Sequence, residues 1–293
     1  MRLSTKILIT GAKGQLGTAL RRLSHTYQKA DWVFADRAVL DLGKPDQLAA
    51  KLTNICPTLI INCAAYTAVD KAESEPVLAD LLNHQAVAML SKWASKNHCK
   101  LIHLSTDYVF DGQSRIPLKE DAETRPINVY GATKLAGEVA CRHHHPEAII
   151  LRTSWVYSPT GSNFVKTMVR LMQEKQSLEV VNDQLGSPTY ATDLAAAILA
   201  IIQHPSWEPG TYHFSNEGMV SWYDFSLAIK EIGGFDCSIK GVPSSAYPTL
   251  AKRPSYSLLD KTKIENTYHI KAPNYKESLR RCMEIVQNTE SND

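Results

Sequence analysis

The stretch Lys6-Ile7-Leu8-Ile9-Thr10-Gly11-Ala12-Lys13-Gly14-Gln15-Leu16-Gly17 decides the fold, because an apolar strand runs directly into a glycine-rich turn and then into a helical pattern. Glycine permits the tight turn and lets the backbone approach a pyrophosphate. The N-terminus of the next helix offers unpaired N–H groups and a partial positive charge to phosphates. No Gly-Lys-Ser/Thr sequence closes the loop, which excludes a Walker A loop. A plain strand-to-helix turn is the alternative, and three glycines at three-residue intervals favour dinucleotide binding.

Apolar, β-branched runs alternate with amphipathic segments through the first half of the chain. Strands are predicted at 6–10, 32–35, 58–63, 100–105 and 148–153, and helices at 16–23, 45–52 and 77–95. Repeated strand–helix alternation predicts parallel strands with right-handed crossovers, and continuous apolar strands indicate a sheet covered on both faces. We therefore predict an α/β fold, a doubly wound (Rossmann-type) mostly parallel sheet with a smaller α/β substrate-binding lobe.

Beyond about residue 155 the alternation loosens. Helical patterns cover 161–174, 192–203, 221–232 and 274–286, and prolines divide the remainder into short pieces. We expect a dinucleotide-binding domain over residues 1–155, with a segment at about 189–213 returning to it. Residues 156–293 are expected to form mainly the substrate-binding lobe.

The composition is that of a globular protein without a polyanionic or membrane partner. The 293 residues are 44% hydrophobic and 21% charged, and 32 basic against 30 acidic residues give a net charge of +2. This balance gives no reason to predict nucleic-acid binding or a basic membrane face. No apolar run approaches the roughly 18 residues that span a bilayer, and the first strand follows Met1 without a signal-peptide pattern. Six cysteines without CxxC spacing favour a reduced, cytoplasmic protein.

His143-His144-His145 is a candidate metal cluster. Three consecutive side chains cannot all face one point from a helix, and Pro146 follows them as a helix breaker. We interpret the run as the end of a helix and predict no metal site there.

Tyr130 and Lys134 lie four residues apart in a helical segment, so they share one helix face. A fixed positive charge beside a phenol lowers its pKa from about 10, which makes the tyrosine a usable acid or base. The spacing alone is weak evidence, because it arises often by chance on solvated helices. Next to a dinucleotide loop it favours a catalytic pair.

Ser105 and Thr106 end the fourth predicted strand. Ligands of doubly wound sheets bind beyond the carboxyl ends of the strands, and a hydroxyl there would orient a substrate carbonyl beside the tyrosine oxygen. Neighbouring strand residues point to opposite faces, so only one of the two can face the site. The residues alone leave this choice open, and either hydroxyl can instead cap the strand end.

Asp36 and Arg37 follow the second predicted strand. An acid at this distance from the glycine loop binds a ribose 2′-hydroxyl and favours NAD, whereas an adjacent arginine pairs with the 2′-phosphate of NADP. Lys13 in the loop also favours the phosphate. These residues leave the choice between NADH and NADPH open.

The Gly-x-x-Gly-x-x-Gly spacing resembles that of extended short-chain dehydrogenase/reductases. Beyond this, the strings at 63–73, 105–110, 152–157 and 182–189, together with Arg253-Pro254, resemble signatures of the dTDP-4-dehydrorhamnose reductase family. The resemblance runs in register from the glycine loop to about residue 260. It implies an NADPH- or NADH-dependent oxidoreductase that reduces the 4-keto group of dTDP-4-dehydro-L-rhamnose to dTDP-L-rhamnose, for polysaccharide biosynthesis.

The resemblance also implies site residues. Thr106, Tyr130 and Lys134 become the catalytic set, which selects Thr106 over Ser105. With the residues chosen above, the cofactor-binding set is Gly11, Gly14, Gln15, Leu16, Gly17, Asp36, Arg37, Asp41, Leu42, Ala64, Ala65, Tyr66, Thr67, Tyr130 and Lys134. The substrate-binding set is Thr106, Asp107, Trp155 and Arg253, although Trp155 suits core packing equally well.

Some members of the family use magnesium, held by a glutamate two residues past the last loop glycine. Here that residue is Ala19, and a hard cation needs oxygen ligands, so we predict no metal site. A homodimer is one option for the assembly. Two other functions stay open, a reductase of another dTDP-4-keto-6-deoxy sugar and a non-catalytic NADP-binding regulatory subunit like the methionine adenosyltransferase beta subunit. The intact Thr106, Tyr130 and Lys134 count against the regulatory role.

Overall fold

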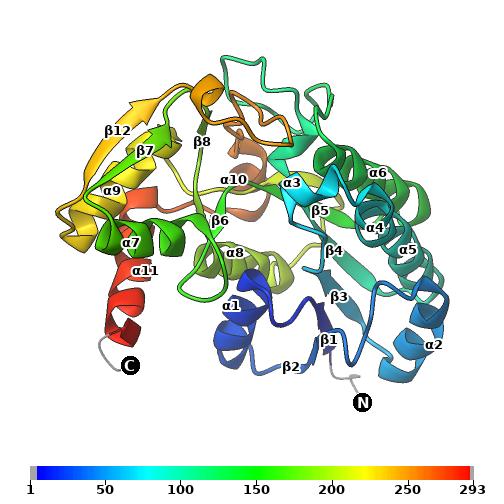
Figure 1. The fold of residues 1–293 in the computed structure, drawn as a ribbon. Helices are drawn as coiled ribbons and strands as arrows, with labels where there is room; N and C mark the ends of the chain where they lie inside the picture. Colours follow the sequence, from blue (N-terminus) through cyan, green and yellow to red (C-terminus); the bar gives the residue numbers. More distant parts are fainter. Residues whose placement is uncertain (1–4, 291–293) are drawn as a thin grey trace.

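Six parallel strands form the central sheet of the computed structural model, which describes residues 5–290 (Figure 1). Their order is β10–β5–β4–β3–β1–β2. The order reverses between β1 and β3, so a crevice opens beyond the carboxyl ends of these strands. The predicted fold class is confirmed. The strands are β1 (Thr5–Thr10), β2 (Ala30–Ala35), β3 (Leu59–Asn62), β4 (Lys100–Thr106), β5 (Ile149–Thr153) and β10 (Gly210–His213).

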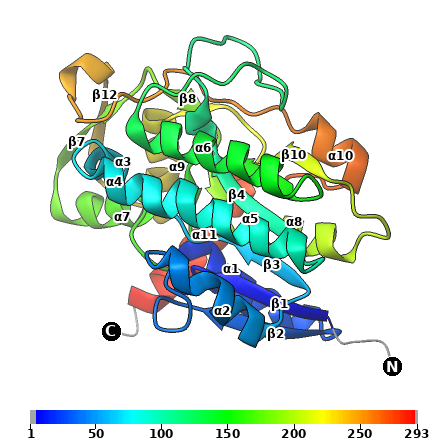
Figure 2. The ribbon, with the colours of Figure 1, turned by 90° about the vertical axis from the view of Figure 1, so that its right-hand side faces the viewer.

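Helices cover both faces of the sheet (Figures 1 and 2). Ile7 and Ile9 of β1 pack towards α1 (Gln15–Leu23) and α8 (Ala191–Gln203) on one face. Leu8 packs into the core on the opposite face. Each face is buried, which explains why the strands are apolar without alternation. The helices of the second face are α2 (Pro45–Ile55), α5 (Ala86–Lys96) and α6 (Val129–His144).

Parts of the second half of the chain belong to this layer. Strand β10 pairs with β5, and α8 packs against α1. Helix α10 (Thr262–Tyr268) adds Ile264 and Tyr268 to the same core, a return that the sequence patterns did not predict.

A second core lies in a separate lobe. Phe225, Val165 and Leu279 are fully buried there. The helical patterns of this half are confirmed, but the parallel pair of β7 and β12 was not predicted. The elements of the lobe are α7 (Phe164–Glu174), β7 (Ser177–Val181), α9 (Trp222–Gly233), β12 (Ser238–Val242) and α11 (Tyr275–Glu290).

The remaining short strands form two further pairs. The strand pairs are β6 (Val156–Tyr157) with β9 (Thr189–Tyr190), and β8 (Leu185–Gly186) with β11 (Val220–Ser221). The predicted helix 77–95 consists of α4 (Pro76–Asp80), a π-helical turn at Leu81–Gln85 and α5, and α3 (Val69–Ala72) precedes it. Helix α6 ends at His144, as the histidine run indicated. No helix among residues 5–290 is long and apolar enough to cross a membrane.

Candidate active site

The glycine loop forms a tight turn between β1 and α1. Gly11 has a φ of +63°, and a Cβ there would lie 2.8 Å from the Ala64 nitrogen. Gly14 is the N-cap of α1 and supplies no side-chain cap, so the first N–H groups of the helix keep their capacity to bind an anion. A Cβ at Gly17 would overlap the Gly11 carbonyl oxygen. The first two glycines therefore shape the turn, and the third permits close packing of the helix.

A cavity of about 470 Å³, which we name the loop cavity, lies at this turn. It adjoins the ends of β1, β3 and β4, where the fold predicts a ligand. Most of the predicted cofactor residues line it, namely Gly11, Gly14, Gln15, Leu16, Asp36, Arg37, Asp41, Leu42, Ala64, Ala65, Thr67, Tyr130 and Lys134.

Lys134 lies buried beneath the loop cavity. Its Nζ donates a hydrogen bond to the Leu104 carbonyl oxygen at 2.6 Å. Burial lowers the pKa of Lys134 to about 8, against the opposing effect of the Glu138 carboxylate. The ammonium therefore keeps its charge at neutral pH but loses it in mildly alkaline solution.

Tyr130 lies beside Thr106 in the buried part of the site. Burial raises the pKa of Tyr130, and the negative charge of Asp107 acts in the same direction. The pKa of Tyr130 therefore lies above its ordinary value and not below it as expected, because desolvation of the phenol dominates. The phenol stays protonated at neutral pH, which is the state that a proton donor needs.

The strand end distinguishes Ser105 from Thr106. Ser105 Oγ donates to Glu138 Oε1 at 2.6 Å within the core. Thr106 Oγ1 donates to Asp107 Oδ1 at 3.0 Å and accepts from the Tyr108 N–H at 3.2 Å. Thr106 acts on the pKa of Tyr130, whereas Ser105 lines the loop cavity. The choice of Thr106 as the catalytic hydroxyl stays a prediction.

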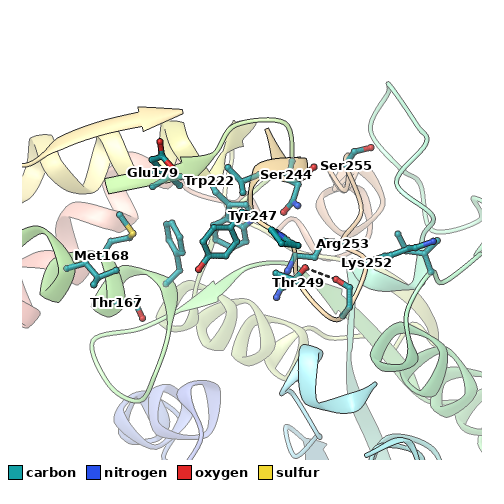
Figure 3. Close-up of a pocket in the computed structure, with 18 of the residues that line it drawn as sticks. Thr167, Met168, Glu179, Trp222, Ser244, Tyr247, Thr249, Lys252, Arg253 and Ser255 are labelled. Atoms are coloured by element: carbon teal, nitrogen blue, oxygen red, sulfur yellow. Dashed lines mark hydrogen bonds between the residues drawn. The ribbon is translucent and has the colours of Figure 1, made fainter. Parts of the chain in front are cut away.

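A second cavity of about 800 Å³, which we name the lobe cavity, lies against the lobe (Figure 3). Phe164, Trp222 and Tyr247 contribute aromatic rings to its wall, and Lys252 and Arg253 contribute positive charge. Figure 3 shows α7 on one side of this cavity and the segment that carries Lys252 and Arg253 on the other. Aromatic and cationic groups together suit a ligand with a flat ring and a negative charge.

Tyr108 connects the walls of the two cavities. Its hydroxyl accepts a hydrogen bond from Arg253 Nη1 at 3.2 Å. Its ring packs edge-on against Tyr130, with ring centroids 5.6 Å apart. Arg253 is held from its other side by Asp70 at 2.6 Å. The candidate proton donor of the loop cavity is thus one residue away from the basic wall of the lobe cavity.

The model of the RmlD substrate binding domain family matches residues 5–288. The chain belongs to this family.

Several curated relatives and solved structures are named dTDP-4-dehydrorhamnose reductase. The dTDP-4-dehydrorhamnose reductase of Sinorhizobium fredii is 39% identical, over 95% of this chain and 96% of the relative. The crystal structure of a dTDP-4-dehydrorhamnose reductase from Clostridium acetobutylicum superposes with a TM-score of 0.93 at 37% identity, over 97% of this chain and 100% of that one. The enzyme of that name from Bacillus anthracis, solved in complex with NADP, gives a TM-score of 0.92 at 36% identity, over 96% and 99% of the two chains.

Two predicted cofactor residues of this RmlD-family chain lie outside the lining of the loop cavity. The Tyr66 hydroxyl donates to Glu75 Oε2 at 2.6 Å, and the Tyr66 N–H donates to Asn83 Oδ1 at 2.8 Å. These bonds hold the Tyr66 side chain away from the cavity. Gly17 serves the packing of α1 against the loop instead.

The acid after β2 is already paired. Lys13 Nζ lies 2.6 Å from Asp36 Oδ2, and Asp36 Oδ1 accepts from the backbone N–H groups of Ala38 and Val39. The Lys13 ammonium holds the pKa of Asp36 below its usual value. Lys13, Asp36 and Arg37 all line the cavity, so the structure retains groups that suit both NAD and NADP.

Sequence reasoning missed the loop that closes the cavity from the lobe. Gly161 and Ser162 line the loop cavity. Gln15 Nε2 donates to the Val156 carbonyl oxygen at 3.3 Å, and Ser158 Oγ donates to Gln15 Oε1 at 3.0 Å. No local pattern could have predicted these contacts, because their partners lie more than 140 positions apart in the chain.

The predicted substrate residues lie at different places in the structure. Arg253 lines the lobe cavity, and Asp107 is buried beside Thr106. Burial raises the pKa of Asp107 to about 6. Trp155 does not line either cavity; it is partly buried, packs against the lobe core and stacks on Trp222 with 3.6 Å between ring centroids. The contact of Trp155 with substrate stays a prediction, and in the structure its ring supports Trp222, which lines the lobe cavity.

Magnesium does not fit the position that the family pattern points to. Ala19 is 5% exposed and packs into the core between α1 and the sheet. Residues 5–290 contain no group of three or more His, Cys, Asp or Glu side chains that could hold a metal ion.

Proposed function

We propose that the chain reduces the 4-keto group of dTDP-4-dehydro-L-rhamnose to give dTDP-L-rhamnose, with NADPH or NADH as the reductant. One observation carries the proposal. Tyr130, with Thr106 and Lys134 beside it, lies between a glycine-loop cavity and a second cavity with aromatic and basic walls. The name dTDP-4-dehydrorhamnose reductase, which several full-length relatives carry, supports the same reaction.

The loop cavity fits a nicotinamide dinucleotide. Gly11 and Gly14 leave room that a Cβ would fill, and the N-terminus of α1 offers N–H groups to the pyrophosphate. Asp36, Arg37 and Lys13 are placed for the adenosine ribose and its 2′ substituent. Asp41 and Leu42 would lie near the adenine, with Ala64, Ala65 and Thr67 along the cofactor.

The chain's own residues supply the proton. NADPH or NADH, when held by the loop cavity, would supply hydride to C4 of the sugar, which would leave negative charge on the carbonyl oxygen. Tyr130 then donates its phenolic proton to that oxygen, while the Thr106 hydroxyl orients the carbonyl. The positive charge of Lys134 stabilises the phenolate that remains. Because burial raises the Tyr130 pKa, the proton stays in place until the carbonyl oxygen becomes strongly basic.

The lobe cavity is the proposed site for the dTDP moiety. The rings of Phe164, Trp222 and Tyr247 offer stacking surfaces to a base, and Lys252 and Arg253 offer charge to the diphosphate. Asp70 and Tyr108 hold the Arg253 guanidinium in place. On this proposal, residues 1–155 with the return at 189–213 bind the dinucleotide, and 156–293 bind mainly the sugar nucleotide.

The test supplies dTDP-4-dehydro-L-rhamnose and follows the oxidation of NADPH and NADH separately. We expect turnover with at least one cofactor and a product that co-migrates with dTDP-L-rhamnose. Absence of turnover with both cofactors would refute the proposal. Faster turnover of another dTDP-4-keto-6-deoxy sugar would favour the first alternative, and NADPH binding without any turnover would favour a regulatory subunit.

The proposal includes a cytoplasmic location and a homodimer. Light scattering after size-exclusion chromatography tests the dimer, for which a mass of one chain, 32.6 kDa, would be the contrary result.

A further inference from the structure

Glu138 is a buried carboxylate one helical turn beyond Lys134 on α6, and none of it is exposed. Its Oε1 accepts hydrogen bonds from Ser105 Oγ at 2.6 Å and Arg152 Nε at 2.8 Å. Its Oε2 accepts from Arg152 Nη2 at 2.7 Å and Arg142 Nη1 at 3.1 Å. Stability alone does not explain such a buried charged cluster, because well-packed apolar residues often stabilise a core equally well.

Two partners of Glu138 lie near the carboxyl ends of neighbouring strands of the central sheet, β4 and β5. Ser105 of β4 and Arg152 of β5 are neighbours in the sheet register. Leu104, which precedes Ser105, accepts the hydrogen bond from Lys134 Nζ. Helix α6 is therefore joined to two successive residues of β4, and the next residue is Thr106.

We propose that Glu138 is a positioning residue for the reduction. Through Ser105 and Arg152 it holds α6 against the ends of β4 and β5, and so sets the placement of Tyr130 and Lys134 relative to Thr106. The inference rests on the proposed function. A displacement of about 1 Å in such an arrangement can reduce a rate by roughly 10²-fold.

Glu138 also acts on the charge of Lys134. The other titratable groups that face this lysine are Cys63 after β3, His103 on β4 and Cys141 on α6. Burial raises the pKa of both thiols and lowers the pKa of His103, so all three are uncharged at neutral pH. Glu138 supplies the negative charge that favours the ammonium, and Arg152 and Arg142 in turn favour the ionised form of the Glu138 carboxylate.

Glu138→Gln tests the positioning role because it keeps the size and an acceptor for Ser105 but removes the charge. We expect kcat to fall roughly 10- to 100-fold, with the KM for the sugar nucleotide within about threefold. The alkaline limb of the kcat profile should move to lower pH. The matched control is Glu174→Gln on α7, which removes an exposed carboxylate paired with Arg170 and should leave kcat and the profile unchanged.

Ser105→Ala separates the effect of Glu138 on the position of α6 from its effect on the charge of Lys134. It removes one of the bonds to Glu138 without a change of charge. We expect a lower kcat with the alkaline limb unmoved.

A readout independent of turnover is the titration of Lys134, followed by its 13Cε chemical shift in lysine-labelled protein and assigned with Lys134→Arg. In Glu138→Gln this pKa should be lower than in the parent. A folded Glu138→Gln protein with the parental kcat and the parental titration would overturn the inference. If the parent fails to reduce the sugar but the titration still shifts, then the proposed function has failed and the link between Glu138 and Lys134 stands.

If Glu138→Gln does not fold, Glu138→Asp tests the positioning role of Glu138 instead. Aspartate keeps the charge but is one methylene shorter, so it cannot reach Ser105 and both arginines at once. We expect a lower kcat with an unmoved alkaline limb, and a parental kcat would overturn the inference.

Discussion

The loop cavity and the lobe cavity approach each other at Tyr130 and Tyr108, yet the chain builds them in different ways. The loop cavity is lined largely by short contiguous segments that follow β1, β2 and β3, and much of its binding capacity lies in the backbone. The lobe cavity is lined by side chains from segments spread between Asp111 and Ser255. The first is therefore a property of local sequence, whereas the second exists only after the lobe has packed.

The largest effect should come from the residue between the two cavities. Tyr130→Phe keeps the ring that packs on Tyr108 but removes the phenolic proton. We expect kcat to fall about 10³-fold, within the range for loss of a general acid, and NADPH affinity to stay within about twofold. Steady-state kinetics and NADPH fluorescence titration measure the two. A variant with full activity would show that the proton comes from elsewhere.

Asp107 lies at the same boundary and should make stability depend on pH. Its pKa is raised by burial from 3.8 to about 6, so the folded protein binds more protons than the unfolded chain between these values. The contribution of Asp107 to stability therefore falls as pH rises from about 4 to 6, by on the order of 2–3 kcal/mol. Asp107→Asn should remove this fall and be more stable than the parent at pH 7. Urea unfolding at pH 4 and pH 7 measures the difference, and equal pH dependence in both proteins would contradict it.

A side chain at Gly11 should damage the loop cavity alone. Gly11→Ala places a Cβ 2.8 Å from the Ala64 nitrogen at a φ of +63°. We expect NADPH affinity to fall about 10-fold or more, because the loop must shift by enough to lose roughly 1–2 kcal/mol. Gly234→Ala is the matched control, since Gly234 has a φ of +69° at the end of α9 with open space around it. It should lose stability but not NADPH affinity.

Truncation of Tyr247 should weaken the lobe cavity alone. This side chain is 61% exposed, so its removal costs little stability. Tyr247→Ala should raise the KM for the dTDP sugar about 5- to 10-fold, in keeping with the loss of one base-stacking ring, while the Kd for NADPH stays unchanged. Leu250→Ala, in the same segment and also exposed, is the control. A parental KM in Tyr247→Ala would place the base elsewhere.

The smallest effect concerns cofactor choice. The Lys13 ammonium is largely exposed and pairs with Asp36. Lys13→Ala should weaken NADPH binding only about threefold, since exposed charges contribute up to about 1 kcal/mol, and should strengthen NADH binding by freeing Asp36. Parallel titrations with the two cofactors measure the ratio, and an unchanged ratio would exclude Lys13 from the choice.

The sequence predicts the features that local segments form, and not those that depend on contacts between distant segments. The glycine loop, the Tyr130–Lys134 pair and the strand ends are local patterns, and the structure gathers them at one crevice. The choice of Thr106 over Ser105 could not come from strand alternation, because it depends on the contact between Ser105 and Glu138 across the core. Arg253 could be named, but its partner Asp70 lies 183 positions away. The stacking of Trp155 on Trp222 and the hydrogen bond from Tyr66 to Glu75 could not be predicted either, because both are tertiary contacts.

The most direct test of the central claim follows one atom from the loop cavity to the lobe cavity. NADPH and NADH, each labelled with deuterium at nicotinamide C4 on one face or the other, are supplied in turn with dTDP-4-dehydro-L-rhamnose, and the sugar product is examined by mass spectrometry and NMR. With the cofactor that supports turnover, we predict one deuterium at C4 of dTDP-L-rhamnose from one of the two labelled faces. Absence of deuterium at C4 with every labelled form of both cofactors would contradict the account.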